Sequence, residues 1–420
     1  MRVLYSLLIY LATPAVLLYM AWRGLKDPRW RSAWRQRFAL DGPDVSPGGV
    51  VVHAASVGEV NAAAPLVSAL LNRPDMGALT ISSFTPTGAA RARALFGDAP
   101  KYVFAPLDLP GSTRRFFRRL QPRLLIVMET EIWPNLYHQA SAGGIPVILA
   151  NARLSERSVR GYKRYPALVS GALEQLHVAL AQSEADGQRL LDCGMPPENL
   201  RVAGNLKYDI QLPDGLREAA TALRERWGAE RPVIIAASTH EEDDAVVIAA
   251  FREVQERIPG ALLILVPRHP ERFGAVAELA RKAGLASERF SEDEACSPAA
   301  DVFLVDVMGK LVDYYACSDL AIIGGSFGAT GGHNPLEPAA LGLPLICGPD
   351  MSNFGEVAER LREAGAMVAV ANATGLAQKV IELMGDPARR EQMANAGREL
   401  VASGRGALQR TLAEIDTTLN

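Results

Sequence analysis

Short apolar runs alternate with segments of helical spacing along most of this 420-residue chain, and this alternation constrains the fold more than any other feature. Apolar runs of about four to seven residues, bounded by polar or turn residues, are typical of buried parallel strands. Strands that alternate with helices form a parallel sheet covered by helices on both faces. The first series of strands is predicted at residues 50–53, 78–84, 102–105, 124–128 and 146–150, and the second at 233–236, 262–266, 302–304, 320–323, 343–347 and 367–370.

Two such series predict an α/β protein of two doubly wound, Rossmann-like domains that face each other across a cleft. We place an N-terminal segment at residues 1–40, a first α/β domain at 41–212 and a second at 213–420, which includes a helical tail. A polar stretch at 211–231 is expected to be a helical connector between the domains. In sheets of this kind ligands bind at the carboxyl ends of the strands, so loops at those positions are the candidate sites.

Charge and cysteine usage exclude several functional classes. The net charge of −3 gives no support for nucleic-acid binding. The four cysteines are widely spaced and include no C-x-x-C pair, which argues against structural zinc and disulfides and fits a reduced cytosolic compartment.

The N-terminal segment predicts membrane attachment. Residues 3–22 are mostly apolar, and a helix of about 20 residues matches the thickness of a bilayer core. A cleaved signal peptide would have a shorter apolar run with more basic residues before it, whereas only Arg2 precedes this run. Basic residues beside the run mark a cytoplasmic flank, and tryptophans among them suit the membrane interface. These residues are Arg23, Lys26, Arg29, Arg31, Arg35 and Arg37, with Trp22, Trp30 and Trp34.

The domains are therefore expected on the cytoplasmic side of a membrane, held either by a spanning helix or by a helix lying in one leaflet. A second candidate membrane contact is the helix predicted at 112–120, where four arginines surround Phe116 and Phe117. Its basic face with aromatic anchors would suit anionic lipids, although a solvated charged helix is the usual explanation of such a run.

A glycine-rich loop after the strand at 320–323 predicts a nucleotide site. Gly324, Gly325, Gly328, Gly331 and Gly332 precede a short helix that Asn334 can cap. Backbone N–H groups at such a helix start attract phosphate, and Glu337 could accept hydrogen bonds from ribose hydroxyls. The alternative is a tight turn without a ligand.

Three strand-end loops in the first domain carry further candidate residues. Glu59, in His53–Glu59, would be either a helix-capping carboxylate or a general base. Glu129 and Glu131 follow the strand at 124–128, where one can cap the next helix and the other can position a partner or stabilise charge. Lys207 can neutralise a phosphate or carboxylate, or be an ordinary solvated lysine.

In the second domain Arg268 suits a phosphate, and Gly309 allows close approach of the backbone to a base or ribose. The chain contains no D-x-D sequence, so we predict that protein cations, not a divalent metal, stabilise the leaving group. It also lacks the G-x-x-x-x-G-K-[ST] loop expected for phosphoryl transfer from ATP.

Six motifs in this order closely resemble the 3-deoxy-D-manno-octulosonic acid (Kdo) transferases of Gram-negative bacteria: HAASVGE, METEIWPN, GNLKYD, PRHPERF, MGKL and GGSF…GGHNPLEPAALGLP. The resemblance covers nearly the whole chain. It implies the GT-B glycosyltransferase fold and inverting, metal-independent and cofactor-free transfer of Kdo from CMP-Kdo to lipid IVA in lipopolysaccharide synthesis. It also implies an acceptor-binding first domain and a CMP-Kdo-binding second domain, with inner-membrane lipids as a further partner.

The resemblance assigns roles residue by residue. Glu59 matches the general base, and Glu129 and Lys207 match groups that stabilise the transition state. The CMP-binding positions match Pro267, Arg268, Met308, Gly309, Lys310, Asn334, Leu336 and Glu337. In MGKL a lysine stands where many relatives have an acidic residue, which leaves Lys310 a backbone contact.

Two alternatives differ in their chemistry. Another membrane-associated GT-B transferase would use a UDP-sugar and ignore CMP-Kdo. A tethered nucleotide-binding or scaffold protein would release no CMP, and the three strand-end carboxylates Glu59, Glu129 and Glu131 argue against it.

Overall fold

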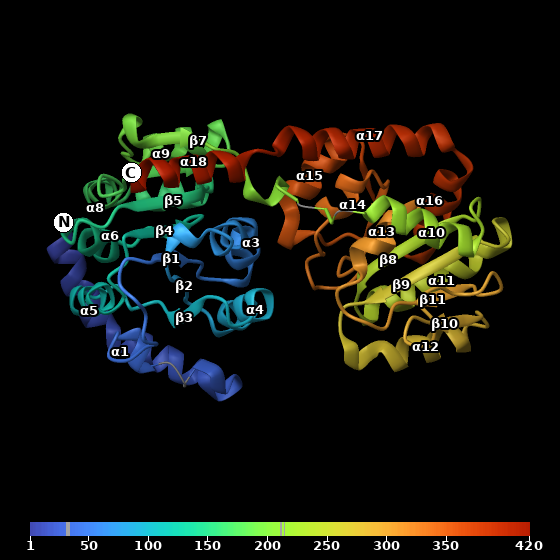
Figure 1. Cartoon of the computed structure of the whole chain (residues 1–420), viewed down its shortest axis with the longest axis horizontal. Helices are drawn as coiled ribbons and strands as arrows, with labels where there is room; N and C mark the ends of the chain where they lie inside the picture. The colour runs from blue at the N-terminus through green and yellow to red at the C-terminus, as the bar shows by residue number, and fades with distance from the viewer. Residues whose placement is uncertain (31–33, 211, 214) are drawn as a thin grey trace. The chain divides into compact units, whose positions relative to one another are not determined.

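The computed structural model describes residues 1–30, 34–210, 212–213 and 215–420. The expected flanking residue Arg31 and two positions of the expected connector, 211 and 214, lie outside them. The chain divides into two compact units, one formed by 1–209 with 404–420 and the other by 210–403 (Figure 1).

Unit 1 is built on a seven-stranded parallel sheet in the order β3-β2-β1-β4-β5-β6-β7. Alternate residues of a strand point to opposite faces, so Val51 joins the apolar core on one face while Val50 and Val52 join the core on the other. The strands are β1 (Val50–His53), β2 (Leu79–Ser83), β3 (Lys101–Phe104), β4 (Leu124–Met128), β5 (Val147–Ala152), β6 (Val178–Ala181) and β7 (Leu200–Val202). The longer helices around them are α3 (Val57–Leu71), α4 (Pro86–Phe96), α5 (Pro110–Leu120), α6 (Pro134–Ala142), α7 (Glu156–Tyr162), α8 (Pro166–Leu173) and α9 (Glu184–Asp192).

Unit 2 contains a second seven-stranded parallel sheet, in the order β10-β11-β9-β8-β12-β13-β14. Its strands are β8 (Val233–Thr239), β9 (Leu262–Pro267), β10 (Ser287–Arg289), β11 (Val302–Leu304), β12 (Leu320–Ile323), β13 (Leu345–Cys347) and β14 (Met367–Ala369). Its helices are α10 (Leu216–Trp227), α11 (Glu241–Arg257), α12 (Phe273–Lys282), α13 (Leu311–Ala316), α14 (Leu336–Leu341), α15 (Gly355–Glu363), α16 (Ala373–Gly385) and α17 (Pro387–Gly404). In each sheet the strand order reverses direction at the first strand, β1 or β8, which is the expected doubly wound topology.

All eleven expected strands are present within a few residues of their predicted bounds, and three more strands were missed. The missed strands β6, β7 and β10 are short. Strands β7 and β10 also lie at the edges of their sheets, contain polar residues and are partly exposed. The apolar pattern that marks a central strand is therefore weak in β7 and β10, whereas β6 is apolar and fully buried but only four residues long.

The last helix differs from the expected division of the chain. The sequence pattern predicts all C-terminal helices in the second domain, but α18 (Ala407–Leu419) packs in unit 1. Ala407, Leu408 and Ile415 join one of its apolar cores, and the carboxylate of Asp209 accepts hydrogen bonds from the Leu408 and Gly406 N–H groups at 2.7 Å. A helical pattern shows which face is apolar but not which core receives it.

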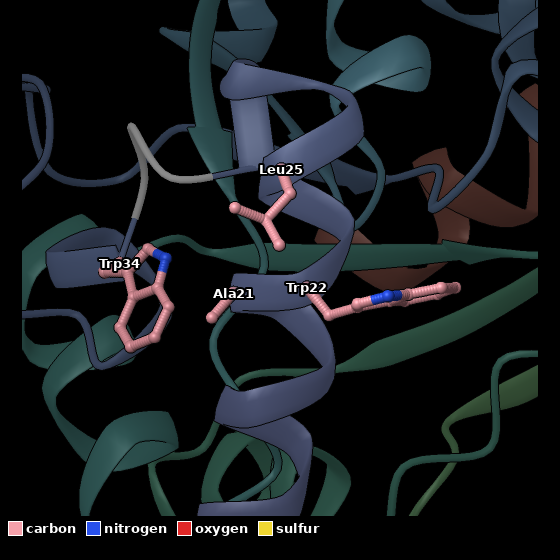
Figure 2. A pocket seen from close by; sticks show the side chains of 4 residues that line it. All are labelled: Ala21, Trp22, Leu25 and Trp34. Carbon is pink, nitrogen blue, oxygen red and sulfur yellow. The ribbon is translucent and has the colours of Figure 1, made fainter.

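The N-terminal helix α1 (Arg2–Lys26) is long and apolar enough to cross a membrane. Its apolar side chains are unusually exposed, as Leu11 at 78% and Leu18 at 72% illustrate. Near its end Ala21, Trp22, Leu25 and Trp34 line an apolar pocket, with Ala21 facing Trp34 across it (Figure 2). Such a surface needs an apolar environment to cover it.

Polar contacts hold the first turns of α1 against the rest of unit 1. The Tyr5 hydroxyl donates to Asp108 Oδ2 at 2.9 Å, and the Ser6 hydroxyl donates to Asn135 Oδ1 at 3.0 Å. Asp108 in turn accepts the Asn135 and Leu136 N–H groups at the start of α6. The beginning of α1 is thus bonded to the helix that follows the Glu129–Trp133 loop.

The second predicted membrane contact is wrong in one respect. Phe116 and Phe117 of α5 are 5% and 6% exposed and belong to an apolar core of unit 1. They pack against the sheet because they lie on the helix face opposite the exposed Arg114, Arg118 and Arg119, so they cannot serve as aromatic anchors.

Candidate active site

Glu59 lies at the third position of α3, immediately after β1. The Ser56 side chain caps the helix and donates to Glu59 Oε1 at 3.0 Å, while the Ala55 N–H donates to Oε2 at 2.8 Å. The carboxylate is therefore held by its own helix start, as expected for the capping alternative. Burial, reinforced by the charge of Glu131, raises its pKa from 4.5 to about 7. A capping carboxylate with this pKa can also exchange a proton near neutral pH.

Glu129 follows β4 with a φ of +57°, in the left-handed region that non-glycine residues seldom adopt. Its side chain is 8% exposed and lies between two cations. Arg153 Nε donates to Oε2 at 3.1 Å, and Lys207 Nζ lies 3.6 Å from Oε1. A strained backbone retained at a charged cluster is typical of a functional site.

The loop also carries Glu131 and Trp133. The Trp133 indole N–H donates to the Glu131 carboxylate, and burial raises the pKa of that carboxyl. The Trp133 ring contacts the buried imidazole of His53 edge-on, with ring centres 5.8 Å apart. Burial lowers the pKa of His53 to about 4, so this ring is neutral. The neighbourhood of Glu59 is consequently poor in water and negatively charged, which explains its raised pKa.

A buried amide network that the sequence did not reveal positions Lys207. Asn151, at the end of β5 with a φ of +53°, accepts the Leu206 N–H through its side chain at 3.0 Å. Gln182 donates to the Asn151 carbonyl and accepts from the Asn205 side chain, both at 2.9 Å. The three amides thereby link the ends of β5 and β6 to the turn that carries Lys207. Arg153 directly follows β5, but its partner Glu129 follows β4, so the sequence analysis missed a contact that only the pairing of these two strands creates.

In unit 2 a buried carboxylate shapes the glycine-rich loop. Asp243, 1% exposed in the first turn of α11, accepts the N–H groups of Gly325, Ser326 and Phe327 at 2.7–3.2 Å. It also accepts the His240 N–H at 2.8 Å. Four hydrogen bonds satisfy this carboxylate and hold the loop against the end of β8.

The expected CMP-binding residues all lie near the carboxyl ends of unit 2 strands. Pro267 ends β9 and Arg268 follows it, half-buried; Met308 is exposed, Gly309 has a φ of +88°, and Lys310 pairs with Asp313 at 3.5 Å. Asn334 accepts the Leu336 N–H at 3.1 Å and donates to Glu337 Oε1 at 3.0 Å. Leu336 is fully buried, and its N–H is occupied by the Asn334 side chain.

The fold and the strand-end residues define a class. Similarity to solved structures places the chain among two-domain proteins of the GT-B type: UDP-GlcNAc 2-epimerase from Neisseria meningitidis, bound to UDP-GlcNAc, superposes with a TM-score of 0.55 over 87% of this chain and 98% of its own, at 16% identity. Residues 233–400 match the family described as glycosyl transferases group 1, so the class is that of the GT-B glycosyltransferases.

The particular family follows from the other matches. Residues 32–210 match the family model described as 3-deoxy-D-manno-octulosonic-acid transferase (kdotransferase). The 3-deoxy-D-manno-octulosonic acid transferase of Haemophilus influenzae is 40% identical over 98% of this chain and 97% of its own length. That of Bordetella pertussis is 38% identical over 100% and 99%. This chain belongs to the Kdo transferase family and is a glycosyltransferase, as the sequence motifs predicted.

Proposed function

We propose that this enzyme transfers Kdo from CMP-Kdo to lipid IVA, with inversion at the anomeric carbon and without a metal ion. The observation that carries the proposal is the Glu59 carboxylate, which is held in place by the start of α3 and whose pKa is raised to about 7.

In the proposed reaction Glu59 is the general base. A sugar hydroxyl of the acceptor is a poor nucleophile, and a base with a pKa near the working pH removes its proton most effectively during attack. The acceptor oxygen forms a bond to the anomeric carbon of Kdo as the bond from that carbon to the phosphate oxygen of CMP breaks. The proton passes to Glu59, and CMP leaves with the bonding electrons. A single displacement of this kind inverts the anomeric centre.

Glu129 and Lys207 are proposed to stabilise the transition state. The anomeric carbon gains oxocarbenium character as CMP departs, as in glycoside chemistry generally. Glu129 offers a negative charge whose orientation is fixed by Arg153 and Lys207. Preorganised charges in a buried site stabilise such a transition state without reorganisation.

Donor binding is proposed for the strand-end residues of unit 2. Arg268 would contact phosphate, and the glycine-rich loop with Asn334 and Glu337 would contact ribose. Met308 and Gly309 would approach the nucleotide through the open turn after β11, with Lys310 contributing its backbone. Cationic side chains would then do what a divalent metal does in many sugar-nucleotide enzymes.

Attachment to the cytoplasmic face of the inner membrane is proposed for α1. Its exposed apolar surface supports this, as does the basic flank that follows it. Deleting residues 1–36 should release a folded protein from membranes that retains activity on detergent-dispersed acceptor. Continued sedimentation with membranes would assign attachment to another surface.

The test of the reaction is mass spectrometry of lipid IVA after incubation with the enzyme and CMP-Kdo. We expect a mass increase of one or more Kdo residues, whose number the same spectrum measures. Parallel incubation with UDP-sugars tests the alternative donor. Transfer from a UDP-sugar with none from CMP-Kdo would contradict the proposal.

A further inference from the structure

Three histidines that the proposed mechanism does not use gather at three strand ends of unit 2. His240 follows β8 and begins α11, His269 follows β9, and His333 lies in the glycine-rich loop after β12. The His240 and His333 rings are stacked with their centres 5.2 Å apart, and His269 meets His240 edge-on at 5.1 Å. They come from segments separated by up to 93 residues, so only the sheet brings them together.

The contact between His240 and His333 limits how many protons the pair can hold. Their Nε2 atoms are 2.9 Å apart, which requires one nitrogen to carry hydrogen and the other to be bare. A second hydrogen between them would place two donors face to face. While the contact persists, the pair can therefore accept one further proton, at a remaining Nδ1 position.

The charged groups around the histidine pair can be grouped into cations that attract an anion and carboxylates that oppose it. Besides burial, the charge of Arg268, the residue before His269, acts on both rings and lowers the pKa of each, and within the described residues the Arg268 guanidinium has no hydrogen-bond or ion-pair partner. Asp243 and Glu242 also face His240, but the Asp243 carboxylate is already occupied by four N–H groups.

Without a ligand the His240–His333 pair stays mostly uncharged. Burial, together with the charges of His240, Arg268 and His269, lowers the pKa of His333 to about 4. Burial is also the main cause that lowers the pKa of His240. Both rings remain partly exposed, so a ligand can reach them.

We propose that His240, His333 and Arg268 bind the phosphate group of the sugar nucleotide, and that the histidine pair takes up one proton as this anion binds. The inference rests on the proposed function for the identity of the nucleotide, but not for the anion site itself. An incoming negative charge favours the protonated imidazole, and a charged N–H donor binds phosphate more strongly than a neutral one. A metal site is the competing explanation of clustered histidines. The described residues contain no group of three or more His, Cys, Asp or Glu side chains arranged to hold a metal ion.

The experiment follows histidine protonation directly in the full-length protein, which has six histidines. Imidazole carbon resonances are recorded from pH 4 to 8 without ligand, with sulfate and with CMP. Sulfate keeps its charge throughout, whereas the phosphate of CMP has its own ionisation near pH 6. We expect the His333 pKa to rise by at least one pH unit with either anion, and the exposed His177 of unit 1 to be unaffected.

A variant provides the second measurement. His333→Gln keeps a polar side chain but cannot take up the proton, so its CMP affinity should fall about tenfold at pH 6, the loss of one charge-assisted hydrogen bond, and less at pH 8. His177→Gln is the matched control and should bind CMP as the wild type does.

The outcomes separate the inference from the proposed function. If CMP binds but neither His240 nor His333 changes its protonation, the inference is wrong and the proposed function stands. If sulfate raises the His333 pKa but CMP does not bind, the anion site stands and the proposed donor is wrong. If neither anion alters any histidine, the inference is overturned.

Discussion

Replacing Glu59 by glutamine separates the two properties that the structure gives this side chain. Glutamine keeps the shape and can still accept the Ala55 N–H, so the start of α3 should form as before. It cannot take a proton. We therefore expect Glu59→Gln to lower the rate of Kdo transfer by ~10²–10⁴-fold, the usual effect of removing a general base. CMP affinity should be unchanged, since the proposed nucleotide contacts belong to unit 2.

The pH dependence of the rate gives a second signature. With a base whose pKa is about 7, the wild-type kcat/KM should fall about tenfold for each pH unit below 7 and level off above it. The residual activity of Glu59→Gln should lack this dependence.

The contribution of Glu59 to the free energy of unfolding should fall as the pH rises, whereas kcat/KM should increase. The pKa of Glu59 is about 7 in the folded protein and near the ordinary 4.5 in the unfolded chain, so the folded state holds the proton more tightly. The stabilisation from that proton is fully present below pH 4.5 and is lost as the pH rises through 7. The difference between the two pKa values corresponds to about 3 kcal/mol. Glu59→Gln avoids this loss, so its stability relative to the wild type should increase by about 3 kcal/mol between pH 4.5 and 8.

The assay is denaturant unfolding of both proteins across this pH range, beside steady-state kinetics with CMP-Kdo and detergent-dispersed acceptor. Glutamine also loses the hydrogen bond from Ser56, which lowers the stability of the variant by the same amount at every pH. This contribution cancels when the two proteins are compared by how their free energies of unfolding change with pH. A variant with near-normal turnover would make Glu59 a capping residue only, and Glu129 or Glu131 the next candidate base. A stability difference that is flat with pH would show that the carboxylate is not perturbed by burial.

We make three further predictions for the same protein. Lys207→Met should lower kcat by ~10²-fold, because the cation near Glu129 is lost from a preorganised site. The protein should still fold, because Arg153 continues to pair with Glu129, and the control Lys163→Met, which breaks only an exposed ion pair with Asp192, should be fully active. Full activity is expected in excess EDTA, and inhibition by EDTA that magnesium reverses would contradict the metal-independent mechanism. Tyr5→Phe should lower the free energy of unfolding by about 1–2 kcal/mol by removing the hydrogen bond to Asp108, whereas an unchanged value would show that α1 is not bonded to unit 1 in this way.

The candidate site was predictable where its residues follow a buried strand. Glu59, Glu129 and Arg268 each lie within a few residues of the end of an apolar run, and the carboxyl ends of parallel strands meet at one edge of a sheet. Arg153, the Asn151–Gln182–Asn205 network and the three histidines also lie at or near strand ends, but their contacts join different strands, so their roles emerge only after the strands are ordered.

What the sequence by itself determined about this protein is its pattern: two series of strands and helices, an apolar N-terminal helix, and motifs specific enough to indicate the Kdo transferase family. These features are local, because periodicity, capping residues and turn residues act over a few neighbouring positions. The tertiary structure alone decided the strand order, the packing of α18 into unit 1, and the burial that turns the Glu59 carboxyl into a group with a pKa of about 7. Those properties depend on segments far apart in the chain, whose charges and apolar surfaces act on one another only once folding has brought them together.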